Sequence, residues 1–199
     1  AIIGLSEEGK TKETLVFPTT IDGYRVFMIG TSLFMHRSSG SIFIEHAKNV
    51  YYTSQNDLVE VSIFYDRMTD DLNVFVGPRY PKVVLYSTAL SSSIKNRKVF
   101  VCKEYYDDMV ELVARLDTYN YTPANVAYYL DEEELCFVDD ADGTKVNVIP
   151  PIPHREGYEF VGWYKDLSFN EPWDFENDVI PAKEYDQDGN YIFKETRIF

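Results

Sequence analysis

The side chains with the clearest chemical use are three large aromatics in the last quarter of the chain. Trp163 and Tyr164 are adjacent, and Trp173 follows after a short polar stretch. Large aromatic rings combine a wide apolar face with a polar edge. Sugar rings bind to such faces by stacking when the faces are exposed. We therefore take Trp163, Tyr164 and Trp173 as candidate ligand-binding residues.

Two acidic clusters could in principle hold a calcium ion, because carboxylate oxygens are its preferred ligands. The stretch Asp186-Gln187-Asp188-Gly189 begins like an EF-hand loop, but Arg197 occupies the position of the required bidentate glutamate. The second cluster, at positions 139 to 142, also lacks a distal glutamate. Asp-Gly turns explain both clusters, so the sequence predicts no metal site.

Histidine and cysteine are too sparse to build a familiar site. No His-x-x-x-His or Cys-x-x-Cys pair occurs among His36, His46, His154, Cys102 and Cys136, so a zinc site has no support. Nothing around either cysteine would activate a Cys-His nucleophile, and no Gly-rich phosphate loop is present. We expect two free thiols, no cofactor and no enzymatic activity. A hydrolase using a carboxylate pair would need a deep cleft and one carboxyl group with a raised pKa.

The composition is that of a folded and strongly acidic protein. Of the 199 residues, 45% are hydrophobic and 16% aromatic, which is enough to bury a core. The 33 acidic and 19 basic residues give a net charge of −14. Nucleic-acid phosphates and anionic membranes repel such a chain, whereas a basic partner would suit it. No apolar run approaches the roughly 20 residues of a membrane span, so we expect no membrane insertion.

A recurring pattern organises the first half of the chain. Short apolar triplets begin roughly 25–30 residues apart, which is typical of a solenoid of stacked units. Four of them share one shape: Leu15–Pro18, Ile42–Glu45, Val74–Gly77 and Val99–Cys102. An extra β-type run lies at residues 58–64. These patterns predict three to five repeat units, each burying its apolar face against its neighbours.

The first unit resembles the BspA-like (treponemal-type) leucine-rich repeat. The matching residues are Pro18, Ile21, Gly23, Val26, Ile29, Gly30 and Phe34. Later units depart from the pattern, for example at Ser87, where the repeat has glycine. The resemblance implies a short β-rich leucine-rich-repeat solenoid over residues 14–118.

A helix is expected to close this solenoid. Apolar residues recur at helical spacing between Lys103 and Leu116, namely Tyr105, Met109, Leu112, Val113 and Leu116. An open apolar end would be insoluble, so we interpret this helix as a cap, with a partner-binding helix as the alternative. Residues 117–123 have the composition of a linker.

The last part of the chain alternates short strands and polar turns. We expect strands at 125–130 and 135–138, and a hairpin between 182–185 and 191–194. A final strand is expected at 196–199. Between them runs the stretch from Pro153 to Asp166, in which alternation would bury Tyr158, Phe160 and Trp163, with bends at Gly157 and Gly162.

This stretch resembles the core of the internalin-type B repeat of bacterial cell-surface proteins. The matching residues are Pro150, Pro153, Arg155, Gly157, Tyr158, Phe160, Gly162, Trp163, Tyr164 and Asp166. The resemblance implies a small β-grasp-like domain over residues 122–199 and a bacterial setting. It implies no catalytic residues, and it makes Trp163 a core residue.

Together the two resemblances imply a fold that is mainly β with a capping helix. They also imply a non-enzymatic, adhesin-like bacterial protein, secreted or at the cell surface, that binds an extracellular protein or glycan. The C-terminal domain would serve as a spacer or second binding module. The alternative is a carbohydrate-binding accessory module of a larger extracellular enzyme. An exposed coplanar pair among Trp163, Tyr164 and Trp173 would favour that alternative, whereas burial of all three would exclude it.

Overall fold

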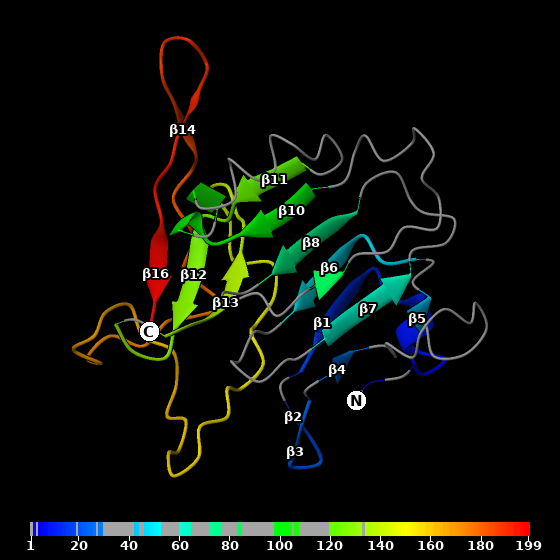
Figure 1. The fold of residues 1–199 in the computed structure, drawn as a ribbon. Helices are drawn as coiled ribbons and strands as arrows, with labels where there is room; N and C mark the ends of the chain where they lie inside the picture. The colour runs from blue at the N-terminus through cyan, green and yellow to red at the C-terminus, as the bar shows by residue number, and fades with distance from the viewer. Residues whose placement is uncertain are drawn as a thin grey trace.

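The computed structural model shows a chain that is mainly β, with very little helix (Figure 1). It describes residues 2, 4–18, 20–26, 28–29, 42–43, 46–52, 60–64, 72–76, 83–84, 98–104, 106–107, 120–132 and 134–199. A short 3-10 helix, η1 (Gly9–Thr11), precedes the first strand. At the start of the expected cap helix, residues 103, 104, 106 and 107 have helical backbone. The rest of that helix lies outside the described residues, so the cap stays a prediction.

A five-stranded parallel sheet forms the centre of the molecule (Figure 1). Its order is β1-β6-β8-β10-β11, and successive strands pair in register from their first residues onward. The strands are β1 (Thr14–Phe17), β6 (Asn49–Tyr52), β8 (Asn73–Val76), β10 (Lys98–Val101) and β11 (Asn120–Pro123). The five strands of this sheet therefore lie side by side in the order in which they occur along the chain, as in a repeat protein.

Three of the four expected triplets form strands of this sheet, and the second of the four forms a strand elsewhere. Ile42–Phe43 is strand β5 of another sheet, and Asn49–Tyr52 takes the place beside β1. The side chains of the first residues explain the choice. The Asn73 amide donates to the Asn49 side-chain oxygen at 2.9 Å, which continues the stack from strand to strand. The expected linker was also wrong at residues 120–123, which form β11.

A second sheet is built from strands that lie, along the chain, between the strands of the five-stranded sheet. Strands β4 (Met28–Ile29), β5 (Ile42–Phe43) and β9 (Val83–Val84) each pair in parallel with β7 (Glu60–Phe64), which confirms the extra run expected there. Strands β2 (Thr20–Ile21) and β3 (Tyr24–Arg25) form a hairpin. The backbone φ is positive at Asp22 (52°) and Gly23 (79°), as a tight hairpin turn requires.

A separate sheet belongs to residues 124–199, called the C-terminal half below. It contains β12 (Val126–Tyr129), β13 (Leu135–Asp139) and β16 (Thr196–Ile198), in the order β13-β12-β16. Strands β14 (Glu184–Tyr185) and β15 (Tyr191–Ile192) form a hairpin that projects away from the body (Figure 1). The strands expected from the sequence in these places are confirmed.

The stretch from Pro153 to Asp166 differs from its expected form. It contains no strand, and its one β-type contact is the bridge between Tyr164 and Pro172. Gly157 (φ 80°) and Gly162 (φ 146°) supply the expected bends, and these bends interrupt the alternation. Tyr158 is therefore 73% exposed, contrary to the expectation that it would be buried.

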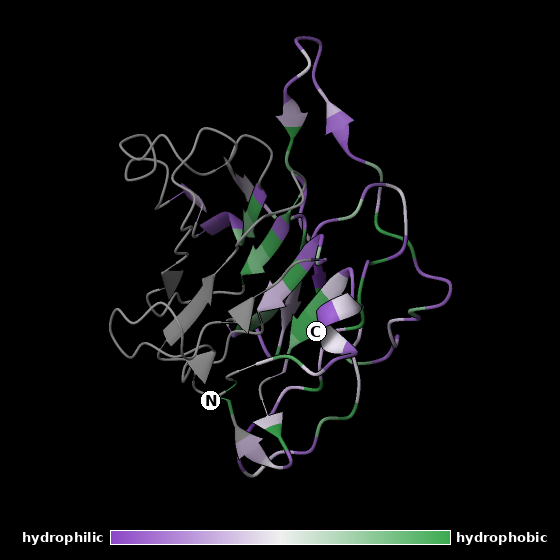
Figure 2. Cartoon of the chain, turned by 90° about the vertical axis from the view of Figure 1, so that its right-hand side faces the viewer, coloured by the Kyte–Doolittle hydropathy of each residue, from purple (hydrophilic) through white to green (hydrophobic). Residues whose placement is uncertain are grey.

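Both faces of the five-stranded sheet are apolar, as is typical of parallel strands. Figure 2 shows hydrophobic residues on these strands and hydrophilic residues on much of the projecting β14–β15 hairpin. One face fills the interior of the repeat half, here meaning strands β1 to β11. Its side chains are Leu15, Phe17, Val50, Tyr52, Val74, Val76, Val99 and Val101. The opposite face carries Tyr51, Phe75 and Phe100, and these meet the C-terminal half.

Candidate functional site

The three candidate ligand-binding aromatics occupy different environments. Trp163 is only 6% exposed, and its ring meets the edges of Tyr128 and Phe160 at centroid distances of 5.1 Å. Tyr164 and Trp173 are half-buried. The Trp173 backbone N–H donates to the Trp163 carbonyl at 2.7 Å, so the two tryptophans are joined through the backbone. Their ligand-binding role stays a prediction.

Tyr164 ties this region to the end of the chain. Its backbone N–H donates to the Phe199 carbonyl, and the Phe199 N–H donates back to the Tyr164 carbonyl at 2.8 Å. The Trp163-Tyr164 pair thus connects β16, Trp173 and the core around Tyr128. The sequence motif is a structural junction of the C-terminal half.

A row of stacked rings forms the contact between the two halves. Tyr51 stacks on Phe75 at a centroid distance of 4.1 Å, and Phe75 stacks on Phe100 at 4.6 Å. We call Tyr51, Phe75 and Phe100 the aromatic ladder. Phe137 of β13 stacks on Tyr51 at 5.4 Å, and β13 packs against β8 and β10. The ladder is buried, so the C-terminal half covers this face of the repeat half.

A buried carboxylate lies at the edge of the ladder. Asp139 is fully buried and accepts four hydrogen bonds. The donors are the Tyr51 hydroxyl (2.9 Å), the Asp140 N–H (2.8 Å), and the backbone N–H (2.7 Å) and side-chain amide (3.0 Å) of Asn147. Burial raises the pKa of Asp139, and these hydrogen bonds partly oppose the rise. Burial and the nearby Asp139 also raise the pKa of Tyr51.

The raised pKa of Asp139 makes a prediction about the pH dependence of stability. The folded protein binds this proton more readily than the unfolded chain, whose aspartates titrate at about 3.9. Asp139 should therefore stabilise the fold increasingly as pH falls through its raised pKa towards that value. We expect urea unfolding at pH values from 8 down to about 4 to show that wild type gains stability relative to Asp139→Asn as pH falls. A difference that grows towards alkaline pH would contradict the assigned direction.

The exposed acidic turns behave differently. Hydrogen bonds within these turns lower the pKa of Asp166, Asp174 and Asp186, and an ion pair with Lys165 lowers that of Asp178. Their stabilising contribution is present above the ordinary carboxyl pKa and is lost only below it. The pH dependence of these four groups is therefore opposite in sign to that expected for Asp139.

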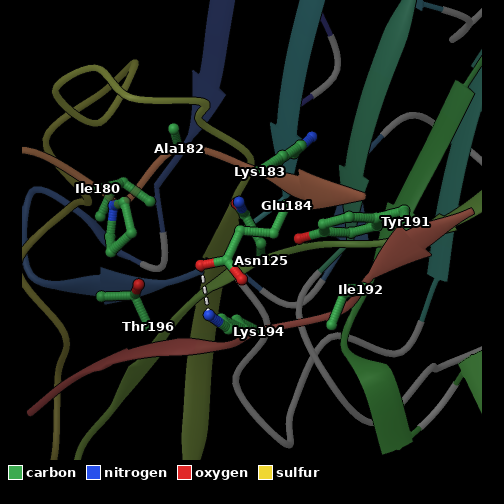
Figure 3. Close-up of a pocket in the computed structure, with 10 residues that line it drawn as sticks. Asn125, Ile180, Ala182, Lys183, Glu184, Tyr191, Ile192, Lys194 and Thr196 are labelled. Atoms are coloured by element: carbon green, nitrogen blue, oxygen red, sulfur yellow. Dashed lines mark hydrogen bonds and ion pairs between the residues drawn. The ribbon is translucent and has the colours of Figure 1, made fainter. Parts of the chain in front are cut away.

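A small pocket lies at the root of the β14–β15 hairpin (Figure 3). Lys183, Tyr191 and Ile192 line it together with Asn125 and Thr196, and Glu184 and Lys194 form an ion pair at its edge. Its interior is about 20 Å³, which is enough for a water molecule. Nearby, Lys183 pairs with Asp140 at 2.6 Å, with both side chains largely buried. The pocket has too little room for an organic ligand, so these polar groups stabilise the hairpin root.

Neither cysteine is placed for chemistry. Cys102 and Cys136 are both buried and are not joined in a disulfide, which agrees with the expected thiols. Burial raises the pKa of Cys136 and disfavours its thiolate. Within the described residues, no group of three or more His, Cys, Asp or Glu side chains could hold a metal ion.

Among the described residues, four of the five most exposed large apolar side chains lie in one stretch, residues 149–161, which we call the apolar segment. Ile149 (67%), Ile152 (69%), Tyr158 (73%) and Val161 (77%) are all exposed. Arg155 lies 5.0 Å from the Tyr158 ring centroid and pairs with Asp131 and Glu134. This surface was not predicted from the sequence. The proline-rich run at positions 150–153 does indicate that the stretch stays outside a β-sheet, because proline cannot donate to a β-ladder.

Part of the chain is similar to a known repeat family. Residues 137–186 match the family model of the Listeria-Bacteroides repeat domain. A stretch of 31 residues is 55% identical to part of a protein of Evansella cellulosilytica named "Putative membrane protein". That stretch is 16% of this chain but 5% of the relative, so the chain covers a small fraction of the relative's length. No solved structure matches the chain.

Within the part of the chain that the structure describes, no helix has the length and apolar character needed to cross a bilayer. The matched region contains Asp139, the whole apolar segment and both tryptophans. The Listeria-Bacteroides repeat is found in bacterial surface proteins. The similarity of residues 137–186 to this repeat indicates a protein associated with the bacterial cell surface.

Proposed function

We propose that this is a non-enzymatic, adhesin-like protein of the bacterial surface that binds an extracellular protein through the apolar segment. The Listeria-Bacteroides repeat supports the surface setting. The stacked parallel strands support a BspA-like leucine-rich-repeat solenoid for the repeat half. The matching residues from Pro150 to Asp166 support an internalin-type B repeat for the C-terminal half.

The observation that carries the proposal is the exposure of Ile149, Ile152, Tyr158 and Val161. These four large apolar side chains lie within one short stretch of the chain, and exposed apolar side chains concentrated in one region commonly mark a site of protein association. Tyrosine is also favoured in such sites, because it gives a large contact area at low entropic cost. The net charge of −14 repels a second copy of this chain and favours a basic partner.

Burial of the aromatic ladder excludes one face of the five-stranded sheet as a binding surface. Repeat proteins often bind ligands on the face of their stacked strands. Here that face packs against β13, so a partner of the folded chain contacts other surfaces. We do not propose the sugar-binding alternative, because Trp163 is buried and only Tyr164 and Trp173 remain partly accessible.

Binding to immobilised extracellular-matrix proteins tests the proposal. We expect saturable binding of the full chain to at least one basic matrix protein, weakened about tenfold or more by Ile152→Ser combined with Tyr158→Ser. Both side chains are largely exposed, so the fold should persist.

The matched control is Ile21→Ser combined with Tyr24→Ser, which removes two exposed apolar side chains from the β2–β3 hairpin. This control should bind like wild type. Equal weakening by both pairs would contradict the assigned surface. An absence of saturable binding to every matrix protein would contradict the proposed function.

A further inference from the structure

Asp139 is the point where three parts of the molecule meet. It is the last residue of β13, which packs against β8 and β10. Tyr51 reaches it from the repeat half, with its hydroxyl 2.9 Å from Asp139 Oδ1. Asn147 reaches it from the loop that leads into the apolar segment, and donates to both carboxylate oxygens. Two residues beyond Asn147, the exposed apolar side chains of the apolar segment begin with Ile149.

We infer that Asp139 is a positioning residue that couples the docking of the two halves to the placement of the apolar segment. The inference rests on the proposed function for its biological meaning, because that function assigns the apolar segment to partner binding. Its physical content is independent of any partner.

The coupling follows from the sharing of one buried acceptor. Tyr51 and Asn147 donate to the same oxygen of Asp139, and a second donor from Asn147 holds the other oxygen. A buried carboxylate is stable only while enough donors surround it. Loss of the Tyr51 hydroxyl therefore destabilises the buried carboxylate to which Asn147 donates. Loss of the Asn147 donors likewise destabilises the carboxylate to which Tyr51 donates.

The surroundings fix both donors in direction. Tyr51 is held between Phe75 and Phe137 by ring stacking, so its hydroxyl has little freedom to find another acceptor. The Asn147 amide also donates to the Asp140 carbonyl at 2.7 Å, which orients the loop at the root of the apolar segment. A change in how the halves pack is thereby passed to residues 147–149.

A double-mutant cycle on the full chain tests the coupling without a partner. The variants are Tyr51→Phe, Asn147→Ala and their combination, compared by the equilibrium constant of urea unfolding. Groups in one hydrogen-bond network are non-additive, so we expect the combined change to differ from the product of the single changes by more than about twofold. The control cycle joins Tyr51→Phe with Lys165→Ala, which removes the exposed Lys165–Asp178 pair. That cycle should be additive.

Hydrogen exchange supplies the local readout that a merely structural role would not give. Tyr51→Phe should raise exchange at residues 147–149 more than at β16. Val99→Ala, which removes two buried methyl groups from the core on the opposite face of the five-stranded sheet, should raise exchange without this preference. Additive effects in the first cycle, or equal exchange at residues 147–149 in Tyr51→Phe and Val99→Ala, would overturn the inference. The matrix-binding assay fails or succeeds separately, so the two claims are distinguishable.

Discussion

Phe75→Ala is expected to lower the free energy of unfolding by about 3–5 kcal/mol. Phe75 is the middle ring of the aromatic ladder and stacks on both Tyr51 and Phe100. It is buried in the cluster that joins the repeat half to the C-terminal half. Truncation removes a large apolar side chain and leaves a cavity between two sheets, neither of which can close it alone. Urea unfolding of the full chain measures the loss.

The control for this prediction is Tyr24→Ala. Tyr24 is an aromatic residue of the same half, but it is 80% exposed at the end of a hairpin. Surface substitutions of this kind stay within about 0.5 kcal/mol. A cost of Phe75→Ala as small as that of Tyr24→Ala would show that the two halves do not pack on each other through the ladder.

Trp163→Ala is expected to cost a similar amount, about 3–5 kcal/mol. The Trp163 ring fills the core between Tyr128 and Phe160. Its backbone also receives the Trp173 N–H, so the surrounding loop depends on its position. Circular dichroism during urea unfolding measures the change, since a fluorescence signal would be altered by the loss of one of the two tryptophans.

The comparison variant for Trp163→Ala is Tyr158→Ala, from the same motif. The Tyr158 ring is exposed and rests against Arg155, so its removal should change stability by less than about 0.5 kcal/mol. Equal costs for the two variants would mean that Tyr158 is also buried, as simple alternation along the motif predicts.

The sequence predicted much of the local structure of the repeat half. The triplets at Leu15, Val74 and Val99 each became a strand of the five-stranded sheet, because β-branched and aromatic residues favour a pleated, buried surface. The same reasoning could not choose between the runs near Ile42 and Val50. Both are apolar enough for a strand, and the choice is made by pairing along the stack through Asn49 and Asn73.

The motif around Trp163 shows where alternation stops being a reliable guide. Its residue types predicted a buried Trp163 correctly, and its glycines marked the bends. Alternation also predicted a buried Tyr158, but the backbone leaves the extended conformation at Gly157 and Gly162. Side chains on the two sides of such a bend no longer alternate between two faces of a strand. Tyr158 and Val161 are therefore exposed.

The contact between the two halves could not be predicted from the sequence. Asp139 belongs to a run of acidic residues that reads as a polar turn, yet it ends a buried strand and binds a hydroxyl from residue 51. Tyr51 and Asp139 are far apart in the chain, and neither has a local pattern that points to the other. The boundaries 14–118 and 122–199, drawn from local pattern, stay predictions.

Equilibrium unfolding of the full chain in guanidinium, followed at both halves, tests the central claim that the two halves fold as one unit. Both tryptophans lie in the C-terminal half, so their fluorescence reports on that half alone. Hydrogen exchange of β8 and β10 reports on the repeat half. Packing through the aromatic ladder predicts that the two signals change together at one midpoint. A repeat half that stays protected after the tryptophan signal is lost would contradict it.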